Sequence, residues 1–182
     1  MNQLADSRDA TLNTENKAED LTARVNRVSR WVYIAIALVV FGGDQATKAL
    51  VESSIPLHDV VPVIPHFFNL TRTQNPGAAF GLFSDAPSPL KTGLLILVSV
   101  VLLVSIIGVV WRSRKIQWEA GVALSLILGG ALSNLLDRLR YGHVTDFLDF
   151  YMKNYHWFTF NLADSAIVVG AGFLVIHMFT AE

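Results

Sequence analysis

Long runs of uncharged, mostly apolar residues divide the chain into segments. Residues 92–111 form a run of 20 without a charged side chain, residues 120–136 and 165–181 form runs of 17 each, and residues 31–43 form a run of 13. A helix of about 20 residues spans the roughly 30 Å hydrocarbon layer of a membrane. The shortest run reaches that length only if its helix continues to about Leu50. The pattern therefore predicts four transmembrane helices, over about 31–51, 92–111, 118–137 and 160–180.

The alternative is a soluble bundle of four buried helices. Such helices would carry polar stripes at helical spacing, and the run over residues 92–111 has none. Composition agrees with the membrane interpretation, because 52% of the residues are hydrophobic and only 16% are charged, against about 25% charged in an average soluble domain. We expect an all-α membrane protein, with a four-helix membrane domain over residues 31–182 and a polar tail over residues 1–30.

Basic residues indicate which way the helices cross the membrane. They cluster before the first predicted span and between the second and the third, at Arg24, Arg27, Arg30, Arg112, Arg114 and Lys115. Because Lys and Arg are enriched on the cytoplasmic side, we expect both clusters and both termini in the cytoplasm. The long links over residues 52–91 and 138–159 then lie outside.

The two outer links are predicted to have structure of their own. Residues 55–73 mix β-branched and aromatic side chains with three prolines, which restrict them to short edge strands. The NPG sequence at 75–77 is typical of a turn. In the second link, the aromatic residues of the DFLDFYMKNYHWFTF segment suit the membrane surface.

Several classes of chemistry are excluded by what the chain lacks. It has no cysteine, which rules out disulfides, thiolate catalysis and zinc sites with a Cys ligand. Its histidines share no metal-ligand spacing, and neither HExxH nor GxSxG occurs. The net charge of −1 gives no field that would attract a nucleic acid. We therefore expect no metal, no cofactor and no nucleic-acid partner.

Four aspartates near the predicted outer edges of the spans are the candidates for chemistry. Asp44 and Asp137 each have a basic residue nearby, whereas Asp146 and Asp164 have none; the basic residues are Lys48 and Arg138. An ionisable group at membrane depth is costly and therefore indicates function. Two carboxyls held close together share one proton. The ionised carboxyl can take a proton from water while the neutral one hydrogen-bonds a carbonyl oxygen, as in aspartic proteases.

Each of these residues also has a purely structural interpretation. Asp44 with Lys48 would be a helix-end ion pair, Asp164 an N-cap of the last helix, and Asp146 an ordinary loop carboxylate. Two other functions stay open on the residues alone. A proton-coupled transporter or channel subunit needs polar residues through the middle of its spans, where the second span offers only serines. A non-catalytic assembly or anchor protein would leave Asp146 and Asp164 without a purpose.

Five short segments occur at the predicted membrane edges: DQATK (44–48), NPGAAF (75–80), GGALSNLLDR (129–138), GHVTDF (142–147) and FNLADSA (160–166). In these segments, their order and the four spans, the chain resembles lipoprotein signal peptidase, also called signal peptidase II, over about residues 31–180. The resemblance implies a bacterial inner-membrane aspartic endopeptidase without a cofactor. Such an enzyme removes the signal peptide from diacylglyceryl-modified prolipoproteins by cutting before the lipidated cysteine.

The resemblance also implies a fold and a set of site residues. The fold is a four-helix membrane bundle with a small outer β-cradle, here over residues 55–80, and a short surface helix, here over about 147–155. The catalytic pair falls on Asp146 and Asp164. Substrates of the family keep their acyl chains among the membrane lipids. The cyclic peptide globomycin inhibits enzymes of the family. The supporting polar residues match Asp44, Lys48, Asn75, Gly77, Asn134, Asp137, Arg138 and Asn161. Of these, we expect Asn75, Asn161 and Arg138 to hold the peptide backbone or to orient the carboxyls.

Overall fold

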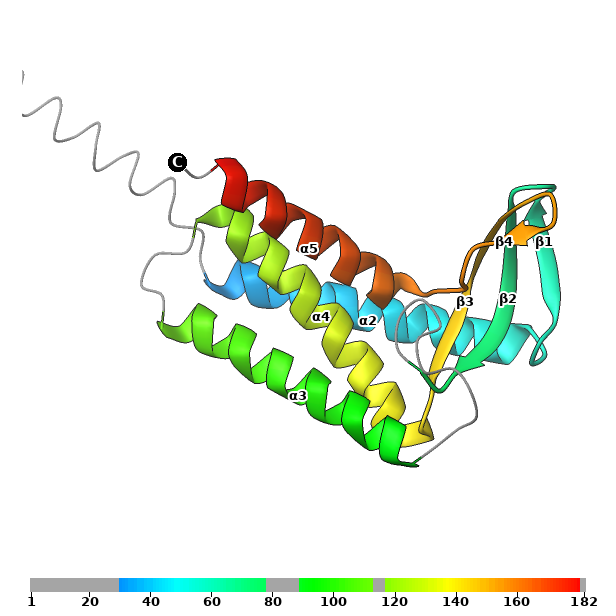
Figure 1. Cartoon of the computed structure of the whole chain (residues 1–182), viewed down its shortest axis with the longest axis horizontal. Helices are drawn as coiled ribbons and strands as arrows, with labels where there is room; N and C mark the ends of the chain where they lie inside the picture. The colour runs from blue at the N-terminus through cyan, green and yellow to red at the C-terminus, as the bar shows by residue number, and fades with distance from the viewer. Residues whose placement is uncertain (1–29, 78–88, 113–116, 181–182) are drawn as a thin grey trace, which may run out of the picture.

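Four long helices dominate the computed structural model, which describes residues 30–77, 89–112 and 117–180 (Figure 1). They are α2 (Arg30–Ser54), α3 (Pro89–Arg112), α4 (Trp118–Tyr141) and α5 (Leu162–Thr180). All four are long and apolar enough to cross a membrane. The prediction of four such helices is thus confirmed, and their ends differ from the predicted bounds by a few residues. The predicted polar tail lies outside the described residues, except for Arg30, at which α2 begins.

The surface and the interior of the bundle have the polarity of a membrane protein. Large apolar side chains point outward: Leu90 and Phe179 are each 82% exposed, and Trp111 is 76% exposed. A soluble monomer rarely exposes so much apolar surface. Polar side chains lie inside instead, and Asp44 and Ser133 have no exposed surface. The chain is a multi-pass membrane protein.

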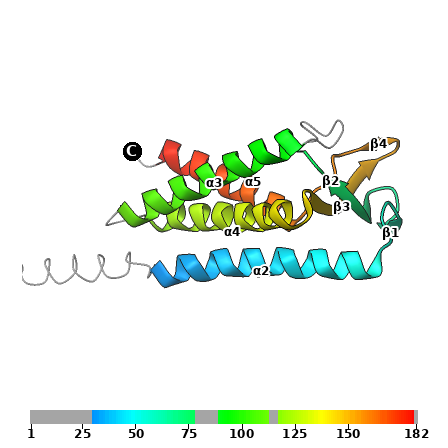
Figure 2. The same cartoon turned by 90° about the horizontal axis from the view of Figure 1, so that it is seen from below.

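Helix α4 is the central helix of the bundle and contacts the other three (Figures 1 and 2). Eleven of its residues are buried, against two in α3 and two in α5. Two glycines allow its neighbours to come close. A β-carbon at Gly129 would lie 2.5 Å from the Ala37 carbonyl oxygen of α2, and one at Gly130 would collide with the Ala163 carbonyl oxygen of α5. Small residues thus bring three helix backbones together, as is common in membranes.

An antiparallel sheet lies at one end of the bundle, where α2 and α4 end and where α3 and α5 begin (Figure 1). Its strands are β1 (Val60–Ile64), β2 (Phe68–Asn75), β3 (Val144–Met152) and β4 (Tyr155–His156), in that spatial order. β1 is an edge strand and contains Pro62, which confirms the edge-strand prediction for the first half of this link. The prediction is wrong for β2, which comes from the same link but is an eight-residue central strand without a proline. Both outer links therefore contribute to one sheet, with β2 and β3 at its centre.

The expected surface helix over about 147–155 is wrong, because these residues belong to β3, a turn and β4. Leu148, Asp149 and Phe150 of this segment pair with the backbone of β2. Lys153 then reverses the chain with φ at 58°, a left-handed conformation that right-handed helices do not contain. Phe150 packs within the sheet instead, and the centroid of its ring lies 4.7 Å from that of Phe68.

Candidate active site

Asp146 lies on β3 at the junction between the sheet and the helices. Its side chain is buried, with the residue 1% exposed. Both carboxyl oxygens accept a hydrogen bond from an asparagine amide: Oδ2 from Asn75 Nδ2 at 2.9 Å and Oδ1 from Asn161 Nδ2 at 2.7 Å. The backbone carbonyl of Asp146 accepts from Thr73 Oγ1 at 3.2 Å. The strand β2 and the segment before α5 thus hold Asp146 from two sides.

Asp164 lies in the first turn of α5. Asn161 caps this helix, because its Oδ1 accepts from the Asp164 backbone N–H at 2.9 Å. The Asp164 carboxyl accepts in return from the Asn161 backbone N–H at 3.4 Å, which is the reciprocal pattern of a capping box. The alternative that Asp164 itself is the N-cap is therefore wrong. Its other oxygen accepts from Asn134 Nδ2 at 2.8 Å, so α4 also holds this carboxyl.

The three asparagines of the site point their NH₂ groups at the two carboxyls for a common reason: each amide oxygen already accepts from another donor. The partners are the Gly77 N–H for Asn75, Lys48 Nζ for Asn134, and the Asp164 N–H for Asn161. An amide has one acceptor oxygen and one donor nitrogen. Fixing the oxygen therefore directs the nitrogen, and each asparagine orients the carboxyl that it contacts.

The pKa of Asp146 is raised from its ordinary 3.8 to about 7. Burial is the main cause, because it penalises the charged form, and the negative charge of Asp164 adds to it. The amide donors of Asn75 and Asn161 and the ammonium group of Lys48 act in the opposite direction. Asp146 therefore keeps a proton up to near-neutral pH beside a second carboxyl. Such a pair can serve as acid and base in one reaction.

Lys48 is the centre of a buried charge network below the two carboxyls. Its Nζ lies 2.7 Å from Asp44 Oδ2, 2.6 Å from Asp137 Oδ2 and 2.9 Å from Asn134 Oδ1. All three ammonium protons thus have an acceptor. The expected pair of Asp44 and Lys48 is present, but Asp137 pairs with Lys48 rather than with Arg138. The network joins α2 to α4. It also contacts Asn134, which in turn donates a hydrogen bond to Asp164.

Asp44 also holds the start of α5, because its Oδ1 accepts from the Ala163 backbone N–H at 2.9 Å. Two residues of this network were missed by the sequence analysis. Ser133 Oγ donates to Asp44 Oδ2 at 2.7 Å, and Gln45 Nε2 donates to Asp137 Oδ1 at 2.7 Å. Each lies inside a segment that carries the resemblance, so position in the DQATK and GGALSN sequences was the signal that could have found them.

Arg138 reaches from α4 to the turn after β2. Its Nη2 donates to the Gly77 carbonyl oxygen at 2.8 Å, and its Nη1 donates to the Asn134 carbonyl oxygen at 3.2 Å. Within the described residues, its buried Nε has no hydrogen-bond partner. Arg138 therefore holds the 75–77 turn against α4, next to Asn75. Residues 78–80 of the NPGAAF segment lie outside the described residues.

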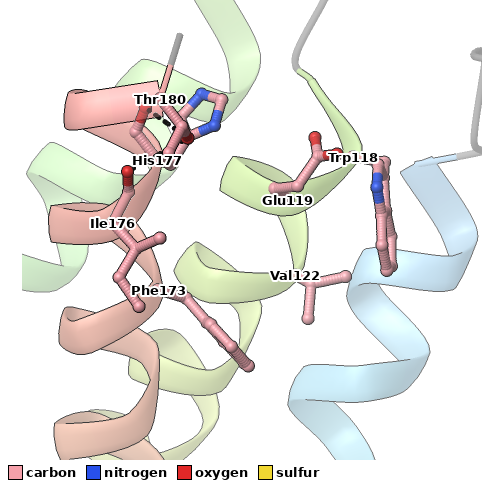
Figure 3. A pocket seen from close by; sticks show the side chains of 7 residues that line it. All are labelled: Trp118, Glu119, Val122, Phe173, Ile176, His177 and Thr180. Carbon is pink, nitrogen blue, oxygen red and sulfur yellow. Dashed lines mark hydrogen bonds between the residues drawn. The ribbon is translucent and has the colours of Figure 1, made fainter.

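A hollow of the described chain lies away from this site. It lies between the start of α4 and the end of α5, at the opposite end of the bundle from the sheet (Figure 3). Its lining is mostly apolar, and it includes Trp118, Phe173 and His177. Among residues 30–77, 89–112 and 117–180, no cluster of three or more His, Asp or Glu residues could hold a metal ion. The candidate site is therefore the carboxyl pair below the sheet.

Known proteins are similar to this chain in sequence and in fold. A family described as signal peptidase (SPase) II matches residues 36–180. The lipoprotein signal peptidase of Solibacter usitatus is 42% identical over 149 residues, which cover 82% of this chain and 91% of that protein. The corresponding protein of Geobacter sulfurreducens is 45% identical over 152 residues, which cover 83% and 93%.

Two solved structures of a bacterial membrane enzyme have the same architecture. One, determined by the in meso method at 2.3 Å resolution, superposes with a TM-score of 0.73 at 32% identity and covers 81% of this chain and 87% of that chain. The other, at 1.9 Å resolution, gives a TM-score of 0.72 at 30% identity and covers 83% and 94%. The four apolar helices, the small sheet and the extended sequence match agree with one another. The chain belongs to the signal peptidase II family of membrane proteases.

Proposed function

We propose that this chain removes the signal peptide from diacylglyceryl-modified prolipoproteins by cutting before the lipidated cysteine, with Asp146 and Asp164 as the catalytic carboxyls. The observation that carries the proposal is the pairing of these two side chains through Asn161, which donates to Asp146 and forms a capping box with Asp164. Family membership supports the substrate class. The raised pKa of Asp146 supports an acid–base role.

The reaction needs one proton shared between the two carboxyls. The ionised carboxyl takes a proton from water as the water oxygen attacks the scissile carbonyl carbon, and the protonated carboxyl gives its proton to the carbonyl oxygen. The tetrahedral intermediate then collapses: the C–N bond breaks, and the proton taken from water passes to the leaving amine of the cysteine. One hydroxyl of the intermediate returns its proton to the carboxyl that had protonated the carbonyl oxygen, so the C=O bond re-forms and the pair again shares one proton. The two products are the free signal peptide and the lipidated protein with a new amino terminus.

The position of the site suits a substrate that stays anchored in lipid. The carboxyl pair lies at the end of the bundle that carries the sheet, so the scissile bond can reach it while the acyl chains remain among membrane lipids. We propose that this end faces outward from the bacterial inner membrane. Arg30 begins α2 and Arg112 ends α3 at the opposite end, where the positive-inside rule places the cytoplasm. We expect globomycin-type inhibitors to compete at the carboxyl pair.

The proposal is tested with the purified full chain in detergent and two forms of one prolipoprotein, with and without the diacylglyceryl group. Mass spectrometry of the products gives the cleavage site. We expect cleavage directly before the lipidated cysteine and at least about a hundredfold slower cleavage of the unmodified form, because the lipid supplies binding energy at the membrane. An inert enzyme, or a cut at another position, would refute the proposal.

A further inference from the structure

The last turns of α2 meet the face of β3 that lies opposite to Asp146. Successive residues of a strand point to opposite faces. Thr145 and Phe147 therefore face α2, while Asp146 points the other way, toward the candidate active site. Phe147 packs against Val51 of α2 and against Ile55, which directly follows the helix, in a small apolar cluster. The end of α2 is therefore the support on which the strand bearing Asp146 lies.

A hydrogen bond between side chains also joins β3 to the end of α2. Glu52 Oε1 accepts from Thr145 Oγ1 at 2.6 Å, and Thr145 is 3% exposed. Glu52 follows Lys48 and Asp44 at intervals of four residues, so the three side chains lie along one face of α2. Asp44 holds α5, Lys48 holds α4, and Glu52 holds β3. One face of α2 thus fixes three elements that carry site residues.

Arg72 attaches β2 to the same end of α2. Between Leu70 and Thr73, β2 contains one residue more than its partner strand, which makes a β-bulge. From this bulge, Arg72 Nη1 donates to the carbonyl oxygens of Glu52 at 3.0 Å and Ile55 at 3.5 Å. Carbonyls at a helix C-terminus lack helical partners and favour a nearby cation. The Arg72 guanidinium group therefore docks the strand on the helix end.

We propose that Glu52 and Arg72 are positioning residues of the cleavage reaction, because they fix β3 and β2 on the end of α2 and thereby set the place of the Asp146 carboxyl. Asp146 directly follows Thr145, the partner of Glu52. Asn75, which donates to Asp146, lies three residues after Arg72. Neither positioning residue belongs to the five segments that carry the family resemblance. The inference rests on the proposed function for its reaction, but the contacts can be tested without cleavage.

The first test reads the protonation of Asp146 directly. Infrared difference spectra between the wild type and Asp146→Asn isolate the carbonyl stretch of the protonated Asp146 carboxyl during a pH titration. Loss of the contact in Glu52→Ala lets water reach Asp146, and hydration favours the carboxylate. We therefore expect the titration midpoint to move to lower pH by at least about half a unit. The exposed glutamate variant Glu119→Ala controls for the loss of one carboxylate elsewhere.

Glu52→Gln separates positioning from charge, because its amide oxygen still accepts from Thr145 although the negative charge is gone. We expect the titration midpoint of Glu52→Gln to lie within about 0.2 pH units of the wild type. Thr145→Val should shift the midpoint as far as Glu52→Ala does. The double variant of Glu52→Ala with Thr145→Val should shift it no further, because both changes remove the same contact. Two results would overturn the inference. One is an unchanged midpoint in Glu52→Ala, and the other is an equal shift in Glu52→Gln, which would assign the effect to charge.

The second test follows cleavage of the lipidated prolipoprotein per folded enzyme. We expect kcat to fall about tenfold in Glu52→Ala and in Arg72→Met, with KM changed less than about threefold, and Arg72→Lys to recover most of the loss. The exposed Arg140→Met is the control. If the wild type cleaves and these variants match it, the inference fails while the proposed function stands. If the wild type does not cleave, the proposed function fails, and the infrared titration still decides the positioning.

Discussion

Replacing Asp146 with asparagine is expected to stabilise the folded protein at pH 8 and to destabilise it slightly at pH 4. The reason is that the folded state raises the pKa of this carboxyl from 3.8 to about 7, so it binds the proton more tightly than the unfolded state does. The free energy of unfolding of the wild type is therefore highest below about pH 4, falls as the pH rises toward 7, and is constant above. The asparagine variant has no carboxyl to ionise at this position, so its free energy of unfolding does not fall over this pH range for this reason.

The magnitude follows from the size of the pKa change. The interval from 3.8 to about 7 corresponds to roughly 4 kcal/mol at about 1.4 kcal/mol per unit. One opposing cost remains, because the new NH₂ group must face the amide donor of either Asn75 or Asn161, which costs about 1–2 kcal/mol. We therefore expect the variant to be more stable than the wild type by about 2–3 kcal/mol at pH 8 and less stable by about 1–2 kcal/mol at pH 4.

Reversible unfolding in mixed detergent micelles, followed by tryptophan fluorescence at pH 4, 6 and 8, measures this difference. Asp59→Asn, at an exposed position before β1, is the matched control and is expected to leave the pH dependence as in the wild type. A difference between Asp146→Asn and wild type that stays constant from pH 4 to pH 8 would refute the reasoning, because it would mean that folding does not raise the pKa of Asp146.

The remaining predictions concern the supports of the carboxyl pair. Lys48→Met leaves two buried carboxylates without their shared cation, so the free energy of unfolding falls by about 3–5 kcal/mol; an equally small effect of Lys48→Met and the exposed Arg140→Met would contradict the network. Gly130→Ala pushes α5 from α4 and costs about 1–3 kcal/mol in thermal unfolding, whereas Gly93→Ala, with no described neighbour within 4 Å, costs nothing; a tolerated Gly130→Ala would contradict the close packing. Asn161→Ala removes the helix cap, worth about 1 kcal/mol, and slows cleavage per folded enzyme at least about tenfold; an unchanged rate would limit Asn161 to capping.

The spanning helices could be predicted from the sequence because each one is a local pattern. A run of about 20 apolar residues is long enough for the membrane, and no tertiary contact is needed to find it. Asp44 and Lys48, four residues apart on α2, were also found as a pair from spacing alone. Local spacing was not enough for Asp137, which has Arg138 beside it in the chain but pairs with Lys48 of another helix.

The strand β3 could not be found from its own residues. Its aromatic content is typical of an interfacial segment, and only the pairing with β2, which is distant in the chain, makes it a strand. The same long-range sheet places Thr145 against Glu52 and Asn75 against Asp146. Contacts of this kind depend on the register of two distant strands, which no local pattern of hydrophobic and polar residues encodes.

The most direct test of the central claim is the cleavage rate of Asp146→Asn and Asp164→Asn on the lipidated prolipoprotein, with Asp149→Asn as the control. Asp149 is buried on the same strand as Asp146, but it pairs with Asn69 and His156. Rates are compared per folded enzyme, from the unfolding transition of each variant. The account predicts loss of at least about a thousandfold in both site variants and near-normal turnover in the control. Substantial cleavage by either site variant would contradict an aspartic mechanism at this pair.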